Sequence, residues 1–165
     1  MAGQSVESVG RTPSPLVRTT FVTQAGRTGG STDAGRGAGR HAGLMAVDPR
    51  GADLKRLLAE DTGGPVVMLN LLRFAEAGAE SYQEYARHLR ETFLPRYGGE
   101  ILYAGSGSTV LVAEDGQSWD AVIVVRYPDR AAFSRMVADP GYQEVTRLRT
   151  EALTEAVLQA TTPWV

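Results

Sequence analysis

Two polar side chains occupy positions where the surrounding pattern predicts apolar residues. Asn70 stands in the middle of the apolar run PVVMLNLLRF, Pro65 to Phe74, and Arg149 lies beside the apolar face of a predicted helix. The arginine fork suits a carboxylate or enolate oxygen, and the amide adds donor and acceptor groups. Together they could stabilise developing negative charge, as an oxyanion site does. The alternative is a structural network that ties a helix to a sheet, because a buried amide needs partners in either case.

His88 is a third candidate for a catalytic role. It follows Tyr85 by three residues and Glu84 by four, so these side chains share one helix surface. It could act as a general base or as an axial haem ligand, and the alternative is a half-exposed helix residue. A lone histidine in a chain without cysteine is a poor metal motif, so we predict no metal and no cofactor.

Four aromatic side chains are candidate ligand contacts: Tyr85, Tyr103, Trp119 and Tyr142. Tyr85 and Tyr142 fall on apolar helix stripes, where an aromatic residue is more commonly part of the core. Tyr103 belongs to a predicted strand, and alternation alone does not decide which face it takes. Trp119 precedes another strand, and the alternative is that it packs at the rim of a barrel or in a dimer interface.

Periodicity and turn residues predict the elements that position these side chains. Asp48 and Pro49 begin a first helix that ends at Gly63-Gly64. The predicted strands are 65–74, 100–104, 109–113 and 120–127, with a short edge strand within 156–163. The remaining helices are 81–97, with a Ser81–Glu84 capping box, 129–138 and 140–154. This order predicts an α+β fold of the ferredoxin-like type, an antiparallel sheet with helices on one face.

The strands at 65–74 and 120–127 are apolar on both faces. Helices cover only one face of such a sheet, so the other face also needs a cover. A second copy of the sheet would provide it and would form a dimeric α+β barrel with two-fold symmetry, so we predict a homodimer. The alternative is that the first helix covers this face within a monomer.

Composition limits the class of protein. The 165 residues fit one folded domain, 45–165, preceded by a segment 1–44 that is rich in glycine and arginine and is predicted to be disordered. We interpret that segment as a dispensable tail, or as residues before a true start at Met45; a basic arm or targeting peptide is the alternative. A net charge of −2 gives no electrostatic case for nucleic acid, and no apolar run approaches the ~20 residues that span a bilayer. Without a secretory signal, we expect a cytoplasmic protein with no membrane partner.

Several motifs, taken together, resemble a known family. They are NLLRF at 70–74, RYGGE at 96–100, Trp119-Asp120, VVRYPD at 124–129 and DPGY at 139–142, with Tyr82, Tyr85, Phe133 and Arg149. The stretch from about Pro65 to Thr154 resembles the 1330 family of domains of unknown function (DUF1330) in the dimeric α/β-barrel superfamily. The resemblance implies a ferredoxin-like fold and dimerisation, with no established activity. Superfamily members include cofactor-free monooxygenases, haem-using enzymes, lactone isomerases and polyketide cyclases, so the fold does not fix the function.

These observations predict a small-molecule site in the cleft between sheet and helices, where Asn70 and Arg149 bind an oxygenated, anionic metabolite. The protein could be a cofactor-free enzyme that acts on an enolisable or aromatic substrate. The alternative is a non-catalytic dimerisation or ligand-sensing module.

Overall fold

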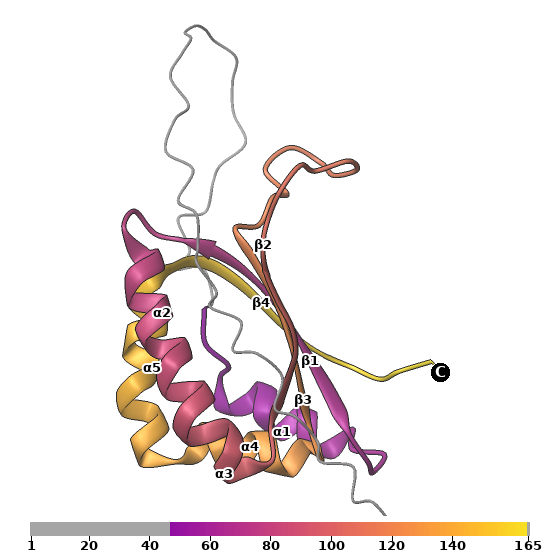
Figure 1. Cartoon of the computed structure of the whole chain (residues 1–165). Helices are drawn as coiled ribbons and strands as arrows, with labels where there is room; N and C mark the ends of the chain where they lie inside the picture. Colours follow the sequence, from indigo (N-terminus) through magenta and orange to yellow (C-terminus); the bar gives the residue numbers. More distant parts are fainter. Residues whose placement is uncertain (1–46, 165) are drawn as a thin grey trace, which may run out of the picture. The chain divides into compact units, whose positions relative to one another are not determined.

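The computed structural model describes residues 47–164; Met45 and the segment 1–44 lie outside the described residues. Four strands form one antiparallel sheet in the order β2-β3-β1-β4 (Figure 1). The strands are β1 (Val66–Phe74), β2 (Glu100–Ser106), β3 (Ala121–Tyr127) and β4 (Leu153–Thr161). The helices are α1 (Gly51–Ala59), α2 (Gly78–His88), α3 (Leu94–Tyr97), α4 (Arg130–Ala138) and α5 (Pro140–Ala152). The predicted α+β fold, ferredoxin-like with helices on one face of the sheet, is confirmed.

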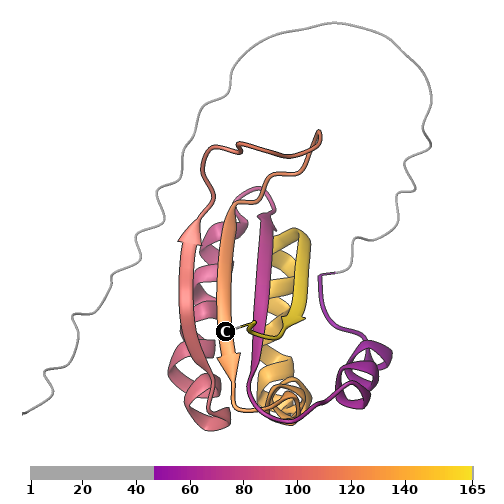
Figure 2. The same ribbon diagram turned by 90° about the vertical axis from the view of Figure 1, so that its right-hand side faces the viewer.

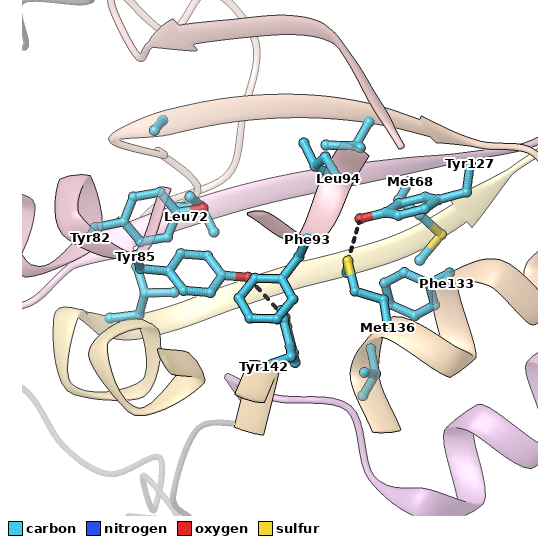
Figure 3. Close-up of a cluster of buried hydrophobic side chains, with 14 of the residues drawn as sticks. Met68, Leu72, Tyr82, Tyr85, Phe93, Leu94, Tyr127, Phe133, Met136 and Tyr142 are labelled. Carbon is cyan, nitrogen blue, oxygen red and sulfur yellow. Dashed lines mark hydrogen bonds between the residues drawn. The ribbon is translucent and has the colours of Figure 1, made fainter. Parts of the chain in front are cut away.

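Alternation along β1 places every second side chain beneath the helices. Val66, Met68 and Leu72 point to that side and are buried. Helices α2 and α5 run side by side across the same face, and α4 lies at the end of the sheet below them (Figure 1). The core between these layers is rich in aromatic and sulfur-containing side chains, which Figure 3 shows interleaved beneath β1. An edge-to-face contact between the rings of Phe93 and Tyr142, with centroids 5.5 Å apart, joins the helical turn that follows α2 to α5 through this core.

The predicted helix 81–97 is one helical run with an interruption. A π-helical turn, η1 (Leu89–Phe93), separates α2 from α3, and the amide of Leu94 donates to the carbonyl of Leu89 five residues earlier. Pro95 lacks an N–H group and its ring crowds the carbonyl four residues before it, so the wider turn accommodates the proline without ending the helix. Ser81 does not cap this helix, which begins at Gly78; its hydroxyl donates to the Leu148 carbonyl instead.

The predicted strand at 109–113 is wrong. Pairing of β2 with β3 ends at Ser106 and Ala121, and residues 107–120 form a loop. Within it, Leu111 and Val112 are 90% and 95% exposed. Their residue types favour a strand, but no neighbouring strand pairs with them. The predicted edge strand is confirmed as β4, but it begins at Leu153 and shortens α5, which was predicted to reach 154.

The first helix begins later than predicted. Arg50, rather than Asp48, is the N-cap of α1, and the helix ends at Ala59. Asp48 instead lies against α5, where it accepts hydrogen bonds from Arg149 and Thr150. The helix lies beside α4 and not across the open face of the sheet (Figure 2), so the predicted alternative of an intramolecular cover is wrong for the described residues.

Candidate functional site

Asn70 lies on the helix-covered side of β1, between the buried residues Met68 and Leu72. Its Nδ2 donates to the carbonyl of Ile123 on β3 at 3.3 Å and, over 3.5 Å, to that of Met68. Across the other edge of β1, Asn70 pairs with Leu158 of β4. The amide nitrogen is thus tied to the sheet, while no bond to the Oδ1 atom is present among the described residues.

Arg149 projects from α5 into the domain and is only 3% exposed. Its Nη1 donates to the backbone carbonyl of Val47 and to Oδ1 of Asp48, the latter at 2.6 Å. The other terminal nitrogen, Nη2, is buried without a hydrogen-bond partner among the described residues. Burial lowers the pKa of Arg149, but Tyr85, Tyr82 and Asp48 raise it, and the balance lies above the ordinary value. The guanidinium is therefore charged and offers an unused donor in a water-poor place.

Three tyrosines of α2 and α5, Tyr82, Tyr85 and Tyr142, lie near this arginine. The hydroxyls of Tyr85 and Tyr142 lie 2.9 Å apart in a buried hydrogen bond, drawn in Figure 3. The rings of Tyr82 and Tyr85 pack at a centroid distance of 5.5 Å. Burial raises the pKa of Tyr82 and of Tyr85 and outweighs the lowering by the charge of Arg149, so both hydroxyls stay protonated. In the Tyr85–Tyr142 bond one hydroxyl donates and the other accepts. The accepting hydroxyl keeps its own proton and can donate a hydrogen bond to a third group.

The structure brings together Arg149, Tyr85 and Tyr142, and it places Asn70 on the sheet side of the same layer. It adds Asp48, which the sequence pattern assigned to a helix cap. No local signal could have identified this partner of Arg149, because 101 residues separate the two. Tyr82 belongs to the same apolar stripe as Tyr85, and its spacing of three residues could have included it.

His88 lies elsewhere, on the outer surface of α2, with about a third of its side chain exposed. Its Nε2 lies 3.1 Å from Oε1 of Glu84, which also pairs with Arg87. The structure gives it the surroundings of a surface helix residue, and it takes no part in the contacts of Arg149.

Tyr103 and Trp119 lie apart from the tyrosine and arginine cluster. Tyr103 pairs with Val124, on the face of the sheet opposite the helices, and is 56% exposed. Trp119 precedes β3, and the guanidinium of Arg73 stacks over its ring at 5.4 Å from the centroid. Arg73 and Val124 lie on the face of the sheet opposite the helices, so both aromatics are on that side. Neither meets the helix-side cluster.

Within residues 47–164, no group of three or more histidine, aspartate or glutamate side chains is arranged to hold a metal ion. No helix in that range has the length and apolar character needed to cross a membrane.

Comparison with known proteins places this fold in a family. The model of the family described as "Domain of unknown function (DUF1330)" matches residues 73–161, and the chain belongs to that family. The RPA0582 protein of Rhodopseudomonas palustris, a protein of unknown function, is 31% identical; the match covers 73% of this chain and 98% of that one, with a TM-score of 0.67. The methylated form of RPA0582 gives 30% identity, 74% and 97% coverage, and a TM-score of 0.68. No curated protein matches the chain.

A more distant similarity joins the chain to a known enzyme. SnoaB, a cofactor-independent oxygenase from Streptomyces nogalater, is 21% identical, and the match covers 61% of this chain and 94% of that one, with a TM-score of 0.44. At this level the similarity carries no argument about the reaction or the ligand of the present protein.

Proposed function

We propose that this protein binds a small, oxygenated, anionic molecule between the sheet and the α2–α5 layer. The observation that carries the proposal is the buried guanidinium of Arg149, whose Nη2 has no partner among the described residues. A buried donor of this strength left unpaired is costly, and a ligand oxygen would satisfy it. Asp48 already pairs with the arginine, but its carboxylate also accepts a hydrogen bond from Thr150 and is partly exposed to solvent. A second anionic oxygen would therefore help to balance the arginine charge.

The neighbouring groups favour the same ligand chemistry. Arg149 Nη2 and the spare hydroxyl proton of the Tyr85–Tyr142 pair are two donors from adjacent helices. Asn70 lies on the sheet side, but both of its amide protons are used by carbonyls of the sheet, so it offers no free donor. The two donors from the adjacent helices suit a carboxylate or an enolate oxygen, and the aromatic rings near them suit an apolar body.

Binding is better supported than proton-transfer catalysis. Tyr82 and Tyr85 have raised pKa values and remain protonated, so their hydroxyls donate hydrogen bonds and do not act as bases. His88, the predicted general base, lies on the outer surface of α2. An enzyme built on this site would therefore act by stabilising an oxyanion, and a ligand-sensing module needs no further group.

Dimerisation through the open face of the sheet is the second part of the proposal. That face carries the apolar side chains Val67, Leu69 and Leu71 of β1 with Val122 and Val124 of β3, and no described helix covers it (Figure 2). Charged pairs lie toward its borders, Arg73 with Glu155 and Arg126 with Glu100. An apolar patch with a charged rim is typical of a protein–protein interface, and a second sheet of the same shape would cover it.

The ligand part is tested by thermal shift on the full-length protein, with a panel of small carboxylates and their neutral amides. Arg149→Gln is compared with Arg147→Gln, which changes an exposed arginine of the same helix. We expect carboxylates to raise the Tm of the wild type and of Arg147→Gln, but not of Arg149→Gln. A carboxylate shift that persists in Arg149→Gln would contradict the site. The absence of any shift in the wild type would favour the non-catalytic dimerisation module.

A further inference from the structure

A cleft of about 240 Å³ lies between α1 and the rest of the domain. Leu54 and Leu57 of α1 line one side, and Met68, Phe133 and Leu158 line the other. Leu158 pairs with Asn70 across β1 and β4, but Asn70 itself does not line the cleft. Asp53, Arg56, Glu60 and Gln159 also line it, so the cleft is amphipathic and its apolar side chains face one another from α1 and from the sheet side.

The segment that leads into α1 connects this cleft to Arg149. Pro49 lines the cleft, and Asp48 immediately before it binds Nη1 of Arg149. The backbone carbonyl of Val47 accepts from the same nitrogen. A third of the Asp48 side chain is exposed, whereas Arg149 has 4% of its side chain exposed. The aspartate thus reaches the arginine from the more open side of the domain and holds Nη1, so a ligand carboxylate that bound both terminal nitrogens would have to replace it.

The segment 47–60 is held lightly. None of the residues of α1 is buried. Besides the contacts of Arg149 with Val47 and Asp48, its main polar anchor is Arg130, whose Nη1 donates to the Leu57 carbonyl at 3.0 Å. A segment with little buried surface and few anchors separates from its domain at low free-energy cost.

We propose that Asp48 is an internal substitute for the carboxylate of the ligand, and that a monocarboxylate with an apolar body replaces it on Arg149. The apolar body would lie against Met68, Phe133 and Leu158, and the displaced segment would carry α1 away from the cleft. This inference rests on the proposed function and adds to it the class of ligand and the group that competes with it. The competition lowers the apparent affinity, because only the fraction of molecules with Asp48 detached can bind.

Isothermal titration of the full-length protein with hexanoate, and with the neutral hexanamide, tests the exchange. Asp48→Asn removes the competing charge and keeps the size of the side chain, so hexanoate should bind about tenfold more tightly than to the wild type. Asp61→Asn is the matched control, because Asp61 is an exposed acid of the neighbouring loop whose carboxylate contacts the amide of Gly63. It should bind hexanoate like the wild type, and hexanamide should bind to no variant.

The outcomes separate the two proposals. Equal affinity of wild type and Asp48→Asn, with binding lost in Arg149→Gln, would overturn the exchange and leave the arginine site standing. Hexanoate binding that survives in Arg149→Gln would overturn both, and so would binding of hexanamide as tight as that of hexanoate. No hexanoate binding by any variant would overturn the exchange.

A second measurement on the wild type is independent of whether the variants fold. Saturating hexanoate should increase amide hydrogen exchange in α1, residues 51–59, while exchange in α5 stays unchanged or slows. Slower exchange in α1 with hexanoate would mean that the helix closes over the ligand, which would overturn the displacement of Asp48.

Discussion

The buried hydrogen bond between Tyr85 and Tyr142 allows a prediction with a defined sign and magnitude. The two hydroxyls are 2.9 Å apart, and the residues are 4% and 7% exposed. Replacing either tyrosine by phenylalanine leaves the other hydroxyl buried and unpaired, which costs about 1–3 kcal/mol. Replacing both tyrosines removes the hydrogen bond and leaves no unpaired hydroxyl. The double variant should therefore lose less stability than the sum of the singles, by about 1–2 kcal/mol.

The assay is equilibrium urea denaturation of the four proteins of the cycle, with the slopes compared to confirm a common two-state transition. Tyr127 provides the control, because its hydroxyl contacts Met136 Sδ at 3.8 Å and has no bond to Tyr85. The Tyr85–Tyr127 cycle should be additive. Additivity of the Tyr85–Tyr142 cycle within about 0.5 kcal/mol would refute the reasoning, since uncoupled hydroxyls would each have their own partners.

Three further predictions concern the interface, the packing and the pH dependence. Leu69→Asp places a charge on the open face of the sheet, so sedimentation should show a folded monomer in place of the dimer proposed for the wild type; a persistent dimer would contradict the proposed interface. Gly78→Ala should lower the free energy of unfolding by about 1–3 kcal/mol, because its Cβ would lie 2.2 Å from a backbone carbonyl oxygen of α5, whereas Gly51→Ala meets nothing within 4 Å and should cost little. A hydrogen bond from Tyr97, with weaker contributions, lowers the pKa of Asp139, so this carboxylate stabilises the fold above its unfolded pKa of about 3.9 and loses that contribution as the pH falls through its folded value. Asp139→Asn should therefore flatten the acid side of the stability profile in urea titrations, and an unchanged profile would contradict this assignment.

The sequence was sufficient for the sheet and its layers because both depend on short-range patterns. The period of two in β1 placed Asn70 and Leu72 on one face and Leu69 on the other, as the pairing with β3 and β4 requires. Asp129 and Asp139 cap α4 and α5 through bonds to nearby amides, and a local motif is enough to predict such caps.

Where the prediction was wrong, a long-range contact decided the structure. Residues 109–113 have the composition of a strand, but β2 and β3 stop pairing at Ser106 and Ala121 and leave them in a loop. Asp48 followed by Pro49 has the pattern of a helix start, but its carboxylate binds Arg149 instead. A buried arginine is a stronger partner for a carboxylate than the amides of a helix end, and its position is set by the fold.

The candidate site was predicted only in part for the same reason. Helical spacing placed Tyr85 and Tyr142 on inward faces and Arg149 beside such a face, and the structure brings the three together. Tyr103 and Trp119 were equally plausible from residue type, yet the register of the sheet and the loop before β3 place them on the other side. The unpaired state of Arg149 Nη2 depends on how segments far apart in the chain pack around it, which no pattern in one segment predicts.

A crystal structure of the full-length protein with the most strongly stabilising carboxylate of the thermal-shift panel tests the central claim most directly. The account predicts a carboxylate oxygen within hydrogen-bond distance of Arg149 Nη2, about 2.7–2.9 Å, with the apolar part of the ligand between the sheet and the helices. A ligand bound elsewhere, with Nη2 paired to a group of the protein itself, would contradict it.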